Sequence, residues 1–339
     1  MEVKVTDKKI NKKTLNRKKK ILLGLLIILL AGIVYEQAGL HFDDTKYKPV
    51  GQLITVNGHK MHIFGEGNGN TTVVFASGWK TPSPYVDFYP LYSELSKHTR
   101  IAVYDRPGYG WSDVANTPRD IDTITEEIHE LLEKSGEKPP YILIGHSIGS
   151  LEVIRFAQIY KNEVKGVVLI DGSNPDMYST MVKASKFAYM RASINNNLIY
   201  LLNKLGIPRL LCNIFPDFYS STVLATARNN LALAPDNFKE IDLAMFLKTF
   251  NNRNQVDEGD NKEMNAQKVV ANGYIKDIPL RIITSEELNN YKQSKDNQLN
   301  LKKWSTDSKQ IIVKGTGHAI HWSHPEVINK EIHAIINDK

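Results

Sequence analysis

A serine flanked by glycines, at the junction of a strand and a helix, constrains the fold of this chain more than any other feature. Residues 145–149 read Gly-His-Ser-Ile-Gly, after an apolar run at 141–144 and before a helical pattern at 151–160. In this setting the serine occupies a sharp, strained turn, and the glycines leave room for the neighbouring strand and helix. The helix also directs free N–H groups toward negative charge that forms beside the Ser147 hydroxyl. The pattern predicts a nucleophilic serine, with a helix-capping serine as the structural alternative.

Strands and helices alternate on both sides of this serine. Apolar runs typical of buried parallel strands cover residues 72–76, 101–104, 141–144, 167–170, 279–283 and 310–313. An amphipathic pattern over 121–132 indicates a helix between two of these strands, and Asn-Gly at 57–58 indicates a hairpin near the start. The alternation predicts an α/β fold with a mostly parallel central sheet flanked by helices.

The alternation stops after Asn174 and resumes near Asp277. The residues between read as helices with aliphatic and aromatic runs, and about a hundred residues are too many for a loop. We therefore expect a helical cap over 175–277, laid on the carboxyl edge of the sheet. The α/β core then comprises residues 51–174 and 278–339.

The first forty residues combine a basic tail with an apolar segment. Residues 1–20 hold nine lysines and arginines against two acidic residues, and residues 21–35 are uncharged and mostly aliphatic. As a helix the apolar segment extends about 22 Å, and the lysines before it can reach lipid headgroups. A cleaved signal peptide is the alternative, but Glu36 lies where cleavage requires a small residue. We expect a basic tail over 1–20 and an uncleaved transmembrane anchor over 21–40, with residues 36–50 as a short tether that follows the apolar segment.

The charge distribution also predicts orientation and partners. The positive-inside rule places the basic tail in the cytoplasm, so the remaining domain of this single-pass protein lies outside it, at the cell membrane. The chain after residue 20 carries a net charge near −1, which gives no support for binding nucleic acid. Its single cysteine, Cys212, excludes an internal disulfide and a multi-cysteine metal site. No metal-ligand or cofactor-binding motif is found, so none is predicted.

Three motifs together resemble the α/β-hydrolase fold family over about residues 51–339. They are Gly-His-Ser-Ile-Gly at 145–149, Asp-Arg-Pro-Gly-Tyr-Gly-Trp-Ser at 105–112, and Gly-His at 317–318 followed by His-Pro-Glu at 324–326. The resemblance implies that Ser147 is the nucleophile and His318 its general base, late in the chain. It also implies an oxyanion hole made by the backbone N–H groups of Ile148 and Trp79.

The resemblance leaves the acid of the catalytic triad open between two positions. Most family members carry aspartate shortly after the strand that matches 280–283, where this chain reads Thr-Ser-Glu-Glu at 284–287. Asp171 ends the preceding strand, a place that some haloalkane dehalogenases of the family use. We favour Asp171, with Glu286 or Glu287 as the alternative. A turn cap at Asp171 and solvated charges at the glutamates are the structural interpretations.

These residues predict an acyl-transferring hydrolase without a cofactor. Dehalogenases and epoxide hydrolases of the family carry aspartate where this chain has Ser147, so cleavage of a carboxylic ester or related acyl bond is favoured. An apolar cap and a nearly neutral surface favour a modestly sized, largely apolar acyl or aromatic substrate. A proline-iminopeptidase-like aminopeptidase is the alternative, and would hold a free amine with cap acids such as Glu240 or Glu258. A catalytically inactive binding module is the non-enzyme alternative, suggested by the irregular acid position.

Overall fold

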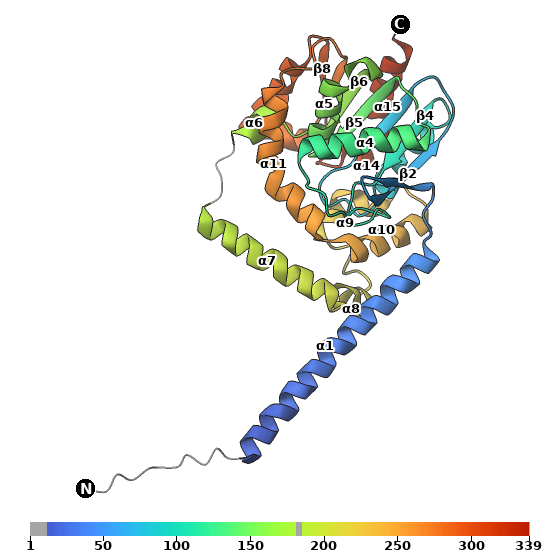
Figure 1. Ribbon diagram of the computed structural model, residues 1–339. Coiled ribbons are helices and arrows are strands. Elements are labelled where there is room, and N and C mark those ends of the chain that lie inside the picture. Colours follow the sequence, from blue (N-terminus) through green and yellow to red (C-terminus); the bar gives the residue numbers. More distant parts are fainter. Residues whose placement is uncertain (1–11, 181–184, 339) are drawn as a thin grey trace, which may run out of the picture.

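The computed structural model describes residues 12–180 and 185–338 and contains one eight-stranded sheet (Figure 1). The strand order is β1-β2-β4-β3-β5-β6-β7-β8. The strands are β1 (Gln52–Val56), β2 (His59–Glu66), β3 (Thr72–Ala76), β4 (Arg100–Tyr104), β5 (Tyr141–His146), β6 (Val164–Ile170), β7 (Leu280–Ser285) and β8 (Ser308–Val313). The first two strands form the hairpin, and β2 pairs antiparallel with β4, whereas all other pairs are parallel. The predicted fold class is confirmed.

Helices cover both faces of the sheet, which is why its central strands are apolar on both sides. Every residue of β3 and β5 is buried. The helices of this α/β body are α2 (Pro84–Asp87), α3 (Tyr89–Leu95), α4 (Ile121–Ser135), α5 (Gly149–Ile159), α12 (Glu286–Asn290), α13 (Lys292–Asn300), α14 (Ile320–Ser323) and α15 (Pro325–Asn337), with short 3₁₀ turns η1 (Lys161–Glu163) and η3 (Leu301–Trp304). Side chains of α4 and α5 join one core cluster, and those of α3 and α15 join the cluster on the other face. Each fully buried aliphatic side chain contributes about 1.5–3 kcal/mol.

The parallel register brings three strand ends to one edge of the sheet. Gly145 of β5 pairs with Ala76 of β3 and with Leu169 of β6, and Ile170 of β6 pairs with Ile283 of β7. Residues that follow these strands therefore meet at the carboxyl edge, where α/β proteins place their ligand sites.

A helical insertion, which we define as helices α6 to α11, lies between β6 and β7 (Figure 1). Its members are α6 (Pro175–Ser179), α7 (Lys186–Lys204), α8 (Ile207–Ile214), α9 (Val223–Ala227), η2 (Asn229–Leu231), α10 (Asp236–Thr249) and α11 (Arg253–Ala271). These helices occupy the residues for which a cap is predicted. Leu231 and Met245 of the insertion join the core cluster that also contains α3 and α15, so part of the insertion packs directly on the α/β body.

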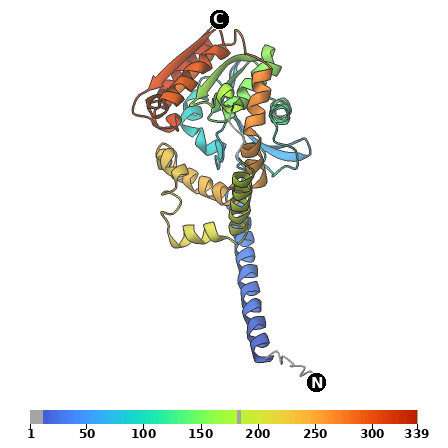
Figure 2. The ribbon, with the colours of Figure 1, turned by 90° about the vertical axis from the view of Figure 1, so that its left-hand side faces the viewer.

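Helix α1 (Lys12–Lys46) projects away from the α/β body (Figures 1 and 2). Its segment Arg17–Lys46 is long and apolar enough to cross a membrane by length and composition. The expected tether is wrong over residues 36–46, because the helix continues through Lys46. The extra turns are stabilised by the insertion, whose Arg209 pairs with Glu36 and Asp43 of α1.

Candidate active site

Ser147 lies at the turn between β5 and α5, in a backbone conformation that side chains rarely adopt. Its φ is 53°, and its N–H donates to the carbonyl of Ile170 at 3.1 Å. A Cβ at Gly145 would lie 2.8 Å from the Cα of Ser150, and one at Gly149 would lie 2.5 Å from the carbonyl oxygen of Ala76. Both glycines are therefore required where strand and helix approach each other closely, as the motif predicts.

Asp171 ends β6 and reaches His318, which lies in the loop after β8. The His318 Nδ1 lies 3.2 Å from Asp171 Oδ2. The other carboxylate oxygen of Asp171 accepts the Ser285 N–H at 2.7 Å, and the Asp171 N–H donates to Ile283 at 2.8 Å. Asp171 is only 2% exposed, whereas the His318 side chain is 45% exposed. The end of β7 thus fixes a buried carboxylate against one nitrogen of an accessible imidazole.

Ser147, Asp171 and His318 line one cavity of about 150 Å³. The other residues of its wall are Gly172, Ser173, Asn174, Met177, Tyr178, Leu288, Ser294, Asn297 and Gln298. Within the described residues no hydrogen bond joins the Ser147 hydroxyl to the His318 ring, and such bonds often tighten only when substrate is present. The structure therefore brings the three residues to one cavity, while their catalytic roles stay predictions.

The alternative acids lie in the same region but engage other groups. The Glu286 carboxylate accepts the N–H of Gly315 at 2.9 Å. Glu287 lies beside Gly317, where an added Cβ would be 3.0 Å from its carboxylate. Among the hydrogen bonds of the described residues, the His318 ring has Asp171 and not these glutamates as its carboxylate partner.

The loop after β3, residues 77–79, carries the second predicted oxyanion donor. Neither the Trp79 nor the Ile148 backbone N–H donates a hydrogen bond within the described part of the chain. A Cβ at Gly78 would lie 3.4 Å from the Ser147 Cβ, so this glycine lets the loop approach Ser147 closely. The Trp79 indole donates to the carbonyl of Gln255 at 2.7 Å, which links the loop to α11 of the insertion.

A buried arginine holds this loop from behind. The Arg106 guanidinium donates to the carbonyls of Ser77 and Gly78, both at 3.0 Å. It also pairs with Glu152 of α5, and with Glu258 of α11 at 3.4 Å. Burial raises the pKa of Glu152 to about 7, and it also raises the pKa of Glu258, although Arg106 opposes both shifts. The 105–112 motif thus supplies a cation that positions the loop.

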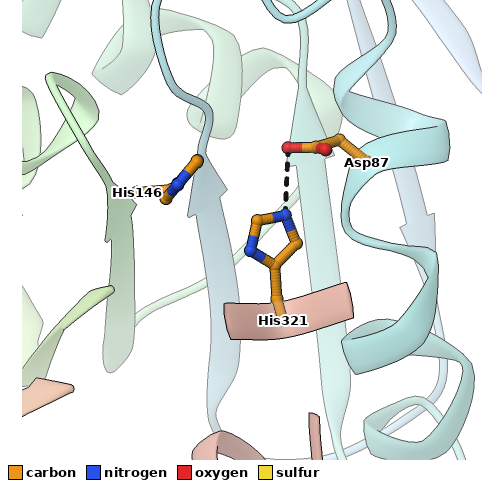
Figure 3. Close-up of side chains that lie close together, drawn as sticks. All are labelled: Asp87, His146 and His321. Carbon is orange, nitrogen blue, oxygen red and sulfur yellow. Dashed lines mark ion pairs between the residues drawn. The ribbon is translucent and has the colours of Figure 1, made fainter. Parts of the chain in front are cut away.

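Close to Ser147, the side chains of Asp87, His146 and His321 converge from α2, β5 and α14 (Figure 3). All three are buried, and their possible ligand atoms lie within 4.8 Å of one another. Asp87 and His321 point toward each other, with Oδ2 and Nε2 3.4 Å apart. Arg228 lies 3.7 Å from the other Asp87 oxygen, which also accepts the Trp322 indole N–H at 3.2 Å. Because a guanidinium already compensates the carboxylate, the donor set does not fit a metal ion, and we interpret it as an ion-pair cluster.

The cluster shifts the pKa values of two of its members. Burial opposes ionisation of Asp87, but His321 and Arg228 outweigh it and hold the pKa of that carboxyl well below its usual range. Burial, together with the neighbouring His321 and His318, holds the pKa of His146 well below its usual value. His146 is therefore a neutral ring behind Ser147, where its Nε2 lies 3.2 Å from the carbonyl oxygen of His318.

Comparison with known proteins decides the family. A family model described as alpha/beta hydrolase fold matches residues 71–325, which is most of the chain. The chain belongs to the α/β hydrolase fold family. This membership confirms the resemblance that the three motifs suggested, and it supports a hydrolase activity.

The relatives of this α/β hydrolase carry names that indicate different activities or none. The uncharacterized protein YbdG of Bacillus subtilis is 31% identical over 314 residues, 90% of this chain and 91% of that protein. A pimeloyl-[acyl-carrier protein] methyl ester esterase of Shewanella woodyi is 33% identical over 33% of this chain and 40% of that protein. The solved Cif epoxide hydrolase of Acinetobacter nosocomialis superimposes with a TM-score of 0.63 at 15% identity, covering 90% of this chain and 96% of that chain. At this identity the last likeness shows the fold alone.

Sequence reasoning missed the polar residues that support the site of this α/β hydrolase. Glu152 and Glu258 have no local motif, although the buried Arg106 of a recognised motif requires an acidic partner. Asp87 and His321 read as ordinary helix residues, and their pairing spans most of the chain. A buried charged side chain needs a neighbour of opposite charge. This need indicates that such a partner exists, but it does not give the partner's position in the sequence.

Proposed function

We propose that the protein is a serine hydrolase that cleaves a carboxylic ester or a related acyl bond. The observation that carries this proposal is the Asp171–His318 contact of 3.2 Å in a cavity whose wall also contains Ser147. A carboxylate on Nδ1 keeps Nε2 available as the base that a serine hydroxyl needs. A serine at this position favours acyl transfer over the chemistry of the epoxide hydrolases that share the fold.

In the proposed reaction, His318 takes the proton of the Ser147 hydroxyl while its oxygen attacks the substrate carbonyl. The N–H groups of Ile148 and Trp79 would stabilise the resulting oxyanion, each by about 3 kcal/mol. His318 then protonates the leaving alcohol, which leaves an acyl-enzyme, and it activates the water that releases the acid. Asp171 orients the ring and stabilises the imidazolium in both steps.

The cavity supports a small acyl group as the part of the substrate that lies next to Ser147. Its volume is about 150 Å³, and Met177, Tyr178 and Leu288 supply apolar wall. The ester chemistry in the name of the Shewanella relative is consistent with this substrate class, although the match covers only a third of this chain. We therefore propose esters with short acyl chains as the first substrates to test.

Two of the acids considered for an aminopeptidase, Glu240 and Glu258, are engaged elsewhere. Glu240 pairs with Lys46 at 2.9 Å and Glu258 pairs with Arg106 and Tyr109. Neither belongs to the wall of the Ser147 cavity. Among the residues that the structure describes, Asp171, which contacts His318, is the one carboxylate in the wall of this cavity, so no second carboxylate there would hold a substrate amine. We therefore expect faster turnover of a p-nitrophenyl ester than of a prolyl-anilide. The reverse preference would contradict the esterase proposal.

A fluorophosphonate probe tests whether the serine is activated. We expect stoichiometric labelling of Ser147 in the folded full-length protein, and none in the Ser147→Ala variant, because only an activated hydroxyl reacts. Hydrolysis of p-nitrophenyl esters of increasing chain length then defines the acyl preference. Absence of labelling in folded protein would favour an inactive binding module of the same fold.

We also propose that α1 is an uncleaved membrane anchor whose basic amino end is cytoplasmic. The Tyr35 hydroxyl of α1 accepts a hydrogen bond from the Asn213 side chain at 2.6 Å, so cleavage after the apolar segment 21–35 would remove a partner of the insertion. The mass of the mature protein and protease protection of the basic tail in intact cells test this topology. A mature protein that begins after residue 35 would contradict it.

A further inference from the structure

Helix α7 carries an exposed apolar stripe. Phe187, Met190, Ile194, Leu198 and Leu201 are between 52% and 70% exposed. They follow one another at intervals of three or four residues, which places them on one face of the helix. A contiguous exposed face of this kind marks a docking surface, because soluble proteins rarely leave one uncovered.

Helix α8 extends the stripe. Leu210, Ile214 and the following Phe215 are exposed, whereas Arg209 and Cys212 on the opposite side are buried. The two helices are joined at Gly206, whose φ is 69° and where an added Cβ would lie 2.9 Å from the Tyr35 ring of α1. We call α7 and α8, with the eight exposed apolar residues named here, the α7–α8 platform.

The other face of α7 is polar and turned toward the rest of the protein. The Asn203 side chain donates to the carbonyl of Phe250 at 2.7 Å, and the Asn251 side chain donates to that of Asn196 at 3.2 Å. Asn196 and Asn197 also line a cavity of about 290 Å³ together with residues of α11. These contacts fix the rotation of α7, so its apolar stripe faces away from the insertion.

The platform lies where the apolar segment of α1 ends. Leu205 approaches α1 so closely that a Cβ at Gly32 would lie 2.8 Å from its carbonyl oxygen. Arg209 holds Glu36 and Asp43, and the Asn213 side chain donates to the Tyr35 hydroxyl at 2.6 Å. Figure 1 shows α7 running across α1, and Figure 2 shows α8, drawn in yellow, running across it. Two helices that cross a membrane-spanning helix at its exit lie in the plane of the membrane surface.

We propose that the α7–α8 platform docks onto the lipid leaflet at the carboxyl end of α1, with its apolar side chains in the headgroup and acyl boundary. The platform is continuous with the apolar segment 21–35, because the two surfaces meet at Tyr35. This continuity favours a lipid bilayer as the partner of the platform. Arg191 and Lys204 lie on the same helix and suit anionic headgroups. This inference rests on the proposed anchor and not on the serine chemistry.

Site-specific fluorescence tests the docking in the full-length protein, reconstituted in vesicles of phosphatidylcholine and phosphatidylglycerol. An NBD probe is attached at Leu198→Cys, on the stripe, or at Asn196→Cys, on the polar face, both with Cys212→Ala. Acyl-chain nitroxide lipids should quench the probe at 198 about twofold and leave the probe at 196 unquenched, because an interfacial helix buries its apolar face about 5–10 Å deep. Equal quenching at both positions, or none at 198, overturns the proposal.

Charge substitution supplies a second, functional readout. The double variant Ile194→Glu/Leu198→Glu should hydrolyse a vesicle-borne ester on the order of tenfold more slowly than wild type, while turnover of a soluble ester is unchanged. The matched double variant Ser193→Glu/Asn196→Glu adds the same charge to the side of α7 that lines the 290 Å³ cavity, and it should keep the vesicle activity. Efficient disulfide crosslinking between copies through Leu198→Cys would assign the stripe to a second chain and overturn the proposal. Fluorophosphonate labelling of each variant shows separately whether Ser147 is active.

Discussion

Two neighbouring strand ends hold strained residues at the site. Ser147 and Asp171 have φ values of 53° and 43°, and a non-glycine residue in this region costs roughly 1–3 kcal/mol. Each of these strained residues is held by a backbone hydrogen bond to the next strand of the sheet. Ser147 donates its N–H to Ile170 of β6, and Asp171 donates its N–H to Ile283 of β7. The strained backbone therefore places a hydroxyl and a carboxylate above the edge of the sheet. The hydrogen bonds to β6 and β7 offset the conformational cost.

At this scale Asp171 can be tested against its rival. In Asp171→Asn the amide can donate to His318 Nδ1 and favour the wrong tautomer, so we expect kcat to fall on the order of 10⁴-fold with KM little changed. The amide oxygen can still accept the Ser285 N–H, so the fold should be retained. Steady-state ester hydrolysis measures the effect, and Glu286→Gln is the matched control. A larger loss in Glu286→Gln than in Asp171→Asn would transfer the role to the glutamate.

The buried imidazole of His146, next to Ser147, should make stability depend on pH. The pKa of His146 is depressed in the folded state, so below about pH 6.5 the unfolded chain binds the proton first and stability falls as the pH falls. In His146→Gln the melting temperature should change less between pH 6.5 and pH 5 than it does in wild type. Near pH 8, where His146 is neutral, the melting temperatures of the two proteins should differ by an amount that does not depend on pH. The depressed pKa of Asp87 acts in a different window, because its contribution is lost only below about pH 4. Parallel profiles of wild type and variant would contradict this assignment.

At the scale of elements, the loop at residues 77–79, which carries the proposed oxyanion donor Trp79, is supported by groups from three parts of the fold. Arg106 follows β4, Glu152 lies on α5 and Glu258 lies on α11, and all three are buried. The arginine joins the two carboxylates to the carbonyls of Ser77 and Gly78. Packing of the insertion is thereby coupled to the position of the Trp79 N–H, which also explains why the 105–112 turn lies next to the site.

Removing the Arg106 side chain should therefore destabilise the folded protein. Arg106→Met leaves two buried carboxylates without a partner, and we expect a loss of about 3–5 kcal/mol of unfolding free energy. Adding Glu152→Gln and Glu258→Gln to that variant should recover part of the loss. The exposed Arg253→Met is the control and should change stability by less than about 0.5 kcal/mol. Thermal unfolding in detergent measures all of them, and an unchanged Arg106→Met would refute the positioning role.

At the scale of the whole molecule, local patterns predict the fold and the two ends of the triad, but not the contacts between distant parts. The apolar runs indicate the parallel strands because strands buried on both faces require them, and Ser147 and His318 lie in short motifs. The contact between Asp171 and His318, on which the proposal of Asp171 as the acid rests, spans 147 residues. The helix beyond residue 35 was missed for the same reason, since Glu36 resembles a solvent charge until Arg209 is placed beside it.

This long-range pairing leads to a prediction for the attachment of α1. Arg209→Leu leaves Glu36 and Asp43 without their buried partner, so we expect a cost of about 3–5 kcal/mol, concentrated where the insertion meets α1. Hydrogen exchange of the full-length protein in detergent should show faster exchange in α8 and in the carboxyl end of α1, with the β5–β6 core unchanged. Lys248→Met removes only the exposed pair with Asp44, which is worth about 0–1 kcal/mol, and should leave exchange in both helices as in wild type. If Arg209→Leu behaves like Lys248→Met, the ion pairs do not hold the two helices together.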